Sequence, residues 1–144
     1  MTNYTSDAET LFRAFARRHS FTIERVDEPG FELLMRVPRQ PGLSFELELG
    51  LQNYDEINIG FEEFWSYFFP YEKARQIVSD TLDALAVGEC RLAIHTQLGG
   101  VLRRVLEQRC NGHWEPIYTA SSRVQIPLLG TRTSHLHNDD ARSR

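Results

Sequence analysis

Cysteine and histidine stand close together at two places, and such pairs could act as a nucleophile and its base. Cys90 precedes His95 by five residues, and Cys110 precedes His113 by three. Nucleophilic catalysis needs a thiol that is activated by a base and oriented by a third group. Neither pair lies in a nucleophile-elbow sequence or at the start of a predicted helix. We therefore assign no catalytic residue and do not expect an enzyme.

A second group of residues has the chemistry of a metal site. The stretch SHLHNDD places His135 and His137 two residues apart and follows them with Asp139 and Asp140. Imidazoles and carboxylates can bind a divalent metal, but a metal site needs ligands held in a fixed geometry. The surrounding sequence is polar and predicts a tail without such geometry. We therefore expect no metal and no cofactor.

Carboxylates dominate one part of the chain. Residues 43 to 66 contain no lysine or arginine but carry Glu46, Glu48, Asp55, Glu56, Glu62 and Glu63. The region from residue 101 onward is basic by contrast, although the whole chain has a formal net charge of −4. An acidic surface repels phosphate backbones and attracts a basic protein surface. The charge pattern favours a basic protein partner and argues against nucleic acid.

Aromatic residues are concentrated directly after these carboxylates, in FEEFWSYFFPY at residues 61 to 71. Phe61, Phe64, Trp65 and Phe68 follow helical spacing and could simply close one end of the core. Tyr67 and Phe69 fall off that stripe, and exposed aromatics beside carboxylates are typical of a binding surface. The predicted partner-binding residues are Glu46, Glu48, Glu56, Glu62, Glu63, Tyr67 and Phe69.

Periodicity predicts two helices and seven strands around these residues. Helices are expected at 6–19 and 71–88, and strands at 21–28, 31–38, 43–52, 57–61, 89–97, 101–109 and 117–121. The segment 101–109 also has helical spacing, but turn dipeptides on both sides favour a strand. Short turns imply antiparallel pairing, so the predicted class is α+β, with a single curved, mainly antiparallel sheet and two helices. Residues 1–127 would form one domain, and 128–144 a polar, disordered tail.

The remaining features concern location. The sequence has no apolar run long enough to span a membrane and no basic and apolar leader at its start, so we expect a cytoplasmic protein without a membrane partner. Cys90 and Cys110 are the only cysteines. Two cysteines in a cytoplasmic chain are expected to be reduced.

The layout of residues 6 to 110, a helix, strands, a helix and strands in a small acidic chain, resembles that of type III secretion chaperones. It differs from them by a fourth strand before the second helix and by the lack of a closing helix. In size, acidity and aromatic content the chain also resembles the immunity proteins of bacterial polymorphic toxins, and the stretch from NIGFEEFWSYFFP to LAVGECRL is similar to other small bacterial proteins. The resemblance implies a bacterial protein that binds another protein, and it allows a homodimer. It carries over no functional residue.

Two hypotheses follow. The first is a non-enzymatic interaction domain of the immunity-protein or chaperone type, which binds a basic partner through the acidic and aromatic residues. The second is a small-ligand domain or enzyme with a pocket between sheet and helices, where His95 or Tyr118 would supply polar groups.

Overall fold

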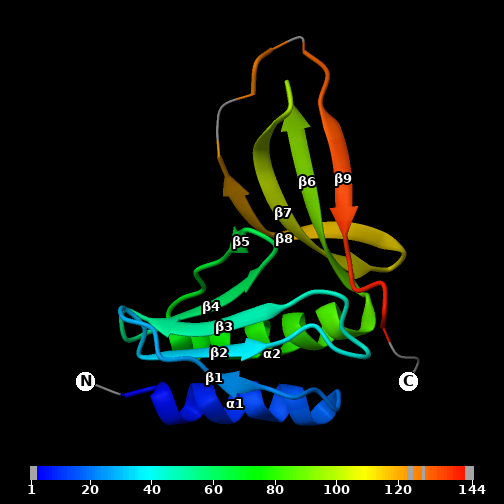
Figure 1. The fold of residues 1–144 in the computed structure, drawn as a ribbon. Helices are drawn as coiled ribbons and strands as arrows, with labels where there is room; N and C mark the ends of the chain where they lie inside the picture. Colours follow the sequence, from blue (N-terminus) through cyan, green and yellow to red (C-terminus); the bar gives the residue numbers. More distant parts are fainter. Residues whose placement is uncertain (1–2, 123–124, 128, 142–144) are drawn as a thin grey trace.

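The computed structural model describes residues 3–122, 125–127 and 129–141 (Figure 1). The helices are α1 (Thr5–Arg18) and α2 (Tyr71–Val87). The strands before α2 are β1 (Glu24–Arg25), β2 (Leu33–Val37), β3 (Leu47–Gln52), β4 (Glu56–Phe61) and β5 (Phe64–Trp65). Those after it are β6 (Cys90–Gln97), β7 (Gly100–Cys110), β8 (His113–Ser121) and β9 (Arg132–Leu136). The order of helix, strands, helix, strands and the α+β class are as predicted.

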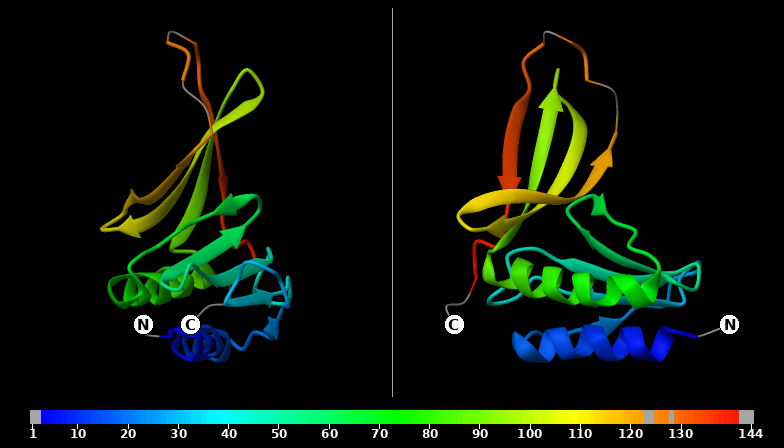
Figure 2. Two further views of the ribbon diagram at one scale, coloured as in Figure 1. Left: turned by 90° about the vertical axis from the view of Figure 1, so that its left-hand side faces the viewer. Right: turned by 180° about the vertical axis from the view of Figure 1, so that it is seen from behind.

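The strands form two antiparallel sheets, so the prediction of a single curved sheet is wrong. The first sheet has the order β1-β2-β3-β4-β5, and the second has the order β8-β7-β6-β9. The second sheet projects from the layer made by the first sheet and the helices (Figures 1 and 2). Tight turns fix which consecutive strands pair, but they do not fix whether strands on either side of a helix share one sheet. Here β6 begins two residues after Gly88, which ends α2 with a positive φ of 82°.

The core of the first layer explains its strand pattern. Alternate residues of β3, namely Leu47, Leu49 and Leu51, are almost completely buried. α1 packs on β2 and β3, and α2 packs on β4 and β6. The opposite side of each strand therefore forms a second surface, which we call the outer face of the first sheet. The alternation of residues 43 to 52 is thus that of a strand with one face in the core.

The segment 101–109 lies in β7, as the turn signals predict, and pairs with both β6 and β8. The alternative of a helix is wrong because two-residue turns at Leu98–Gly99 and Asn111–Gly112 join it to its neighbours. Both turns have positive φ at both residues, which is the geometry that matches the twist of antiparallel strands.

The polar segment near the C-terminus is ordered where the sequence predicts a disordered tail. Residues 132–136 form β9, which pairs with β6. The side chain of Asn138 is buried and donates to the carbonyls of Gly42, at 2.8 Å, and Ala86, at 2.9 Å, while its oxygen accepts from the Ser44 backbone at 2.8 Å. The segment therefore fastens the second sheet to the first layer. Residues 128 and 142–144 of the predicted tail lie outside the described residues.

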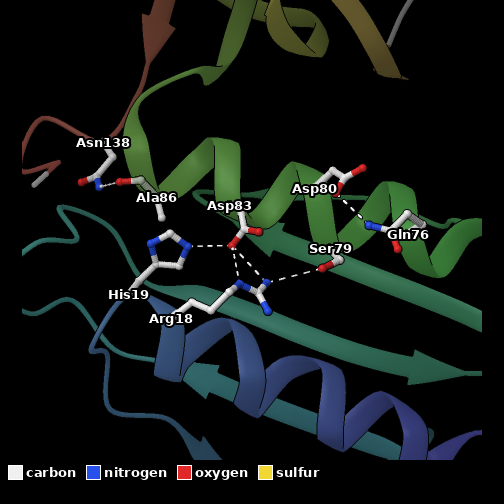
Figure 3. Close-up of polar contacts among 8 residues, drawn as sticks. All are labelled: Arg18, His19, Gln76, Ser79, Asp80, Asp83, Ala86 and Asn138. Atoms are coloured by element: carbon white, nitrogen blue, oxygen red, sulfur yellow. Dashed lines mark hydrogen bonds and ion pairs between the residues drawn. The ribbon is translucent and has the colours of Figure 1, made fainter. Parts of the chain in front are cut away.

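Two carboxylates fasten α1 to α2, one near each end of the helix pair. At one end Asp83 Oδ1 lies 2.6 Å from His19 Nε2 and 3.0 Å from an Arg18 guanidinium nitrogen (Figure 3). At the other end the hydroxyl of Tyr71 and the Arg75 guanidinium donate to Asp7 Oδ2 at 2.5 and 3.0 Å. The hydrogen bond from Tyr71 is the main reason that the pKa of Asp7 lies below its usual value.

Replacing Asp7 with asparagine should make stability less dependent on pH. A carboxyl with a lowered folded-state pKa stabilises the protein above its unfolded pKa of about 3.9, and this contribution is lost as the pH falls through the folded value. We expect Asp7→Asn to lower the urea midpoint at pH 7 and the difference from the wild type to shrink at pH 3. The exposed Asp27 offers a matched control, Asp27→Asn. An equal difference in urea midpoint at both pH values would show that the charge of Asp7 does not contribute to stability.

Candidate functional site

A row of side chains crosses the outer face of the first sheet. The strand registers place Glu24 beside Arg36, Arg36 beside Glu48, Glu48 beside Gly60, and Gly60 beside Trp65. Directly opposed residues of antiparallel strands project to the same side. The row thus runs from a charged region on β1 to β3 into an aromatic region on β5.

Glycine makes room for the aromatic rings on this face. A Cβ atom on Gly60 would lie 2.3 Å from Trp65 Cε3, and one on Gly50 would lie 3.0 Å from Phe31 Cε1. The Phe31 and Trp65 rings pack edge to face, with centroids 5.8 Å apart. Glycine inside a strand often marks such a close approach. The two glycines therefore allow two aromatic rings to approach the backbone of the sheet closely.

The aromatic segment is an edge strand and not the helical turn that its spacing suggests. β5 pairs with β4, and a further bridge joins Phe68 to Ile57. Trp65 therefore projects outward, and the same alternation carries the side chains of Tyr67 and Phe69 away from the core. Tyr67 is 48% exposed and Phe69 is 67% exposed. These two predicted binding residues thus lie on the surface, and the Tyr67 ring lies next to that of Trp65, with centroids 6.5 Å apart.

Buried polar groups hold this edge in place. The Ser66 hydroxyl accepts from the Ile59 backbone N–H at 3.1 Å and donates to its carbonyl at 2.9 Å, and Asn58 Nδ2 donates to the Ser66 carbonyl at 3.0 Å. From the second sheet, the Tyr118 hydroxyl accepts from the Tyr67 backbone N–H at 3.1 Å. The Tyr118 ring also contacts Phe68, with centroids 5.2 Å apart. The exposed aromatics are therefore carried by a fixed backbone.

A hollow of about 220 Å³ lies at the turn between β4 and β5. It is lined by Glu48, Gly60, Phe61, Glu62, Glu63, Phe64 and Trp65. Three of the predicted binding residues, Glu48, Glu62 and Glu63, meet here, although Glu48 is distant from the others in sequence. The rest of the lining is apolar and includes Trp65. We call this site the acidic hollow.

Three of the six carboxylates in residues 43 to 66 are paired with arginines from outside that range. Glu46 contacts Arg36 at 2.5 Å, Glu62 contacts Arg39 at 3.8 Å, and Glu63 contacts Arg104 at 3.2 Å. Glu56 Oε2 accepts a hydrogen bond from Asn53 at 3.0 Å. Among the described residues, Glu48 has no such partner. The run of unpaired carboxylates expected from the sequence is thus reduced, although the Glu63 side chain remains 85% exposed beside its arginine.

The turn that carries two of these carboxylates has an unfavourable backbone. Glu62 and Glu63 have φ angles of 48° and 65°. The same geometry at Asn111–Gly112 uses the residues that adopt it most easily. Residues other than glycine and asparagine rarely adopt a positive φ, and such backbone strain is often found at functional sites. The strain at Glu62 and Glu63 is an independent reason to regard the hollow as functional.

The histidine, tyrosine and cysteine residues considered as catalytic or ligand-binding groups do not meet at one site. The registers place His95 beside Arg103 and Tyr118 beside Leu106, so these two side chains project from opposite faces of the second sheet. Cys90 is buried and Cys110 is exposed, and both thiols are free. Burial raises the pKa of Cys90 to about 12, which disfavours a thiolate nucleophile. No group of three or more metal-ligating side chains occurs in the described part of the chain.

No family model, no curated protein and no solved structure matches this chain. No helix among the described residues is long and apolar enough to cross a membrane. The site is therefore interpreted from its own geometry.

The sequence predicted Glu48, Glu62 and Glu63 individually, but it did not identify three residues that build the site. Gly60 provides the space, Trp65 forms the wall, and Tyr118 fixes the edge strand from the second sheet. A glycine inside the alternating run INIGF was the available signal for a close contact at this position.

Proposed function

We propose that the protein is a non-enzymatic interaction domain that binds a basic partner protein on the outer face of the first sheet. The observation that carries the proposal is the acidic hollow, which Glu48, Glu62 and Glu63 line together with Trp65. A cytoplasmic role of the immunity-protein or chaperone type fits such a surface.

The chemistry of the hollow suits an arginine or lysine side chain from the partner. A guanidinium group forms strong hydrogen bonds with carboxylates and stacks favourably on a tryptophan ring. The pairing of Glu62 with Arg39 at 3.8 Å and of Glu63 with Arg104 at 3.2 Å is solvent-exposed on the glutamate side. Exposed ion pairs contribute little, so a partner cation can replace the contact between Glu62 and Arg39 at small cost. It would share Glu63 with Arg104, whose side chain is only 17% exposed.

Exposed aromatics next to the hollow supply the apolar part of the surface. Tyr67 and Phe69 follow Trp65 along the same edge of the first sheet, where Ser66, Tyr118 and the bridge between Ile57 and Phe68 hold the backbone. Aromatic side chains on a rigid backbone lose little entropy on binding and are frequent energetic centres of interfaces. The face thus combines charge for attraction with aromatic area for affinity.

The rival hypothesis of a ligand pocket between sheet and helices finds less support. The space between the first sheet and both helices is filled by large buried side chains, among them Phe12, Phe15 and Phe45. His95 and Tyr118 would each need a pocket of their own, because they project from opposite faces of the second sheet.

Replacing Glu48, Glu62 and Glu63 together with glutamine should slow association with a basic partner. Surface charges act chiefly on the association rate, and the effect is screened by salt. We expect roughly a tenfold lower association rate at low salt, and a smaller difference at high salt. A matched control changes Glu28, Glu72 and Asp80 to their amides, because these exposed carboxylates lie outside the hollow.

The partner for this measurement is obtained by affinity capture from cells of the source organism. The proposal expects a basic protein that the wild type and the control variant capture and that the triple glutamine variant loses. Equal capture by all three forms would contradict a role for the hollow, and so would capture of acidic proteins only.

A further inference from the structure

The end of the second sheet that projects farthest from the helices carries an exposed apolar group (Figures 1 and 2). Leu98 in the β6–β7 turn is 73% exposed, Ile126 is 44% exposed and Leu129 is 41% exposed. We call these three residues the apolar tip. Single exposed aliphatic side chains are ordinary, but three that are held together call for an explanation.

A buried amide holds the tip together. Gln97, which is 2% exposed, donates from Nε2 to the carbonyls of Ile126 at 3.0 Å and Leu129 at 3.1 Å. Its Oε1 accepts from the Ile126 backbone N–H at 2.8 Å. The loop that carries Ile126 and Leu129 is thus fastened beside the turn that carries Leu98. Specific hydrogen bonds therefore hold the apolar tip together, and its three exposed side chains are not scattered independently over the surface.

Leu98 also occupies a backbone conformation that disfavours it. Its φ is 53°, followed by 77° at Gly99, and the corresponding turn of the next hairpin has 51° at Asn111 and 81° at Gly112. Asparagine is the favoured first residue of such a turn, and leucine is not. Leu98 is therefore unfavourable in two ways, by strain and by exposure. Local strain that persists in this way is associated with function.

The charges around the tip are positive. Residues 90–106 and 116–138 contain no aspartate or glutamate. Arg103 in β7 pairs with His95 in β6. The exposed Arg132 in β9 pairs with Thr96, which precedes the turn residue Leu98 by two positions. The tip is thus convex, apolar and flanked by arginines. The acidic hollow is concave, has an apolar wall and is rimmed by carboxylates.

We infer that the apolar tip of one molecule binds in the acidic hollow of a second copy of this chain. Leu98 would lie against the Trp65 ring. Arg103 and Arg132 project from opposite faces of the second sheet, so they would meet the carboxylates of Glu48, Glu62 and Glu63 from the two sides of the tip. The inference rests on the proposed function, because it names a partner for the same hollow. If two molecules exchange tips reciprocally, the contact closes into a symmetric dimer, and otherwise it forms chains.

Leu98→Asn is the sharpest test, because it removes the apolar side chain and gives the turn its preferred residue. Sedimentation velocity across a concentration series should show reversible association of the wild type. Leu98→Asn should associate at least about tenfold more weakly, as for loss of an anchoring side chain. Its melting temperature should equal or exceed that of the wild type, which excludes misfolding. Wild-type monomers at all concentrations, or unchanged association of Leu98→Asn, would overturn the inference.

Mixing two defective variants tests whether tip and hollow contact each other. The triple glutamine variant keeps its tip and lacks a charged hollow, and Leu98→Asn keeps its hollow and lacks its tip. Each alone should remain monomeric, and an equimolar mixture should form a one-to-one complex. Absence of that complex would overturn the contact. If the hollow still binds a short arginine-rich peptide in that case, the inference fails and the proposed function stands. If the hollow binds neither the tip nor the peptide, both the inference and the proposed function fail.

Discussion

Gly60→Ala should destabilise the protein and remove the acidic hollow, although alanine is normally the better residue in a strand. The new Cβ atom would lie 2.3 Å from Trp65 Cε3 and 2.6 Å from Cζ3, so the ring must move off the sheet. Forcing extra volume into a packed contact costs about 1–3 kcal/mol. Urea unfolding should show this loss, and binding of a basic partner should weaken at the same time because Trp65 leaves the wall.

A double-mutant cycle separates this clash from other effects of alanine. In a Trp65→Ala background the obstructing ring is absent, and Gly60→Ala should become neutral or stabilising by up to about 1 kcal/mol. Gly130→Ala is the matched control, since nothing lies within 4 Å of the added Cβ atom there. Additive losses in the cycle would contradict the packing of Trp65 over Gly60.

Asn138→Ala should cost about 2–4 kcal/mol, because it leaves buried backbone groups without partners. The carbonyls of Gly42 and Ala86 and the N–H of Ser44 all bond to this one side chain. Chemical denaturation measures the loss, and the neighbouring exposed Asp139 provides the control variant Asp139→Ala. A change below about 0.5 kcal/mol is typical of a surface substitution. It would mean that the C-terminal segment does not fasten the second sheet to the first layer.

The strands of the first layer could be predicted because their core-facing residues alternate strictly. Leu47, Leu49 and Leu51 in β3 and Ile57 and Ile59 in β4 fill one face, and a shift by one residue would expose all of them. The separation into two sheets could not be predicted, since it depends on how the chain leaves α2 at Gly88. β9 was missed because its residues are polar and exposed. Its order comes from pairing with β6 and from the anchor at Asn138.

The conformation of the binding segment could not be read from periodicity. Phe61, Phe64, Trp65 and Phe68 match a helix, but Trp65, Tyr67 and Phe69 match an outward-facing strand equally well. The turn that decides between them has glutamates at positions where asparagine and glycine are usual, so it gave no turn signal. The arginines that pair with Glu46, Glu62 and Glu63 come from β2, the loop after it and β7. Only tertiary structure brings them to the outer face.

The indole N–H signals of the two tryptophans test the central claim most directly. Trp65 lines the acidic hollow. Trp114 lies in the second sheet, where the Arg91 guanidinium is 4.1 Å from its ring centroid. Trp114 therefore serves as the control, because its ring already has an intramolecular cation. Titration of ¹⁵N-labelled protein with a short arginine-rich peptide should shift the Trp65 signal and leave that of Trp114 in place. The triple variant of Glu48, Glu62 and Glu63 should abolish the shift. An unchanged Trp65 signal, or equal shifts in the triple variant, would contradict a basic-partner site on the outer face.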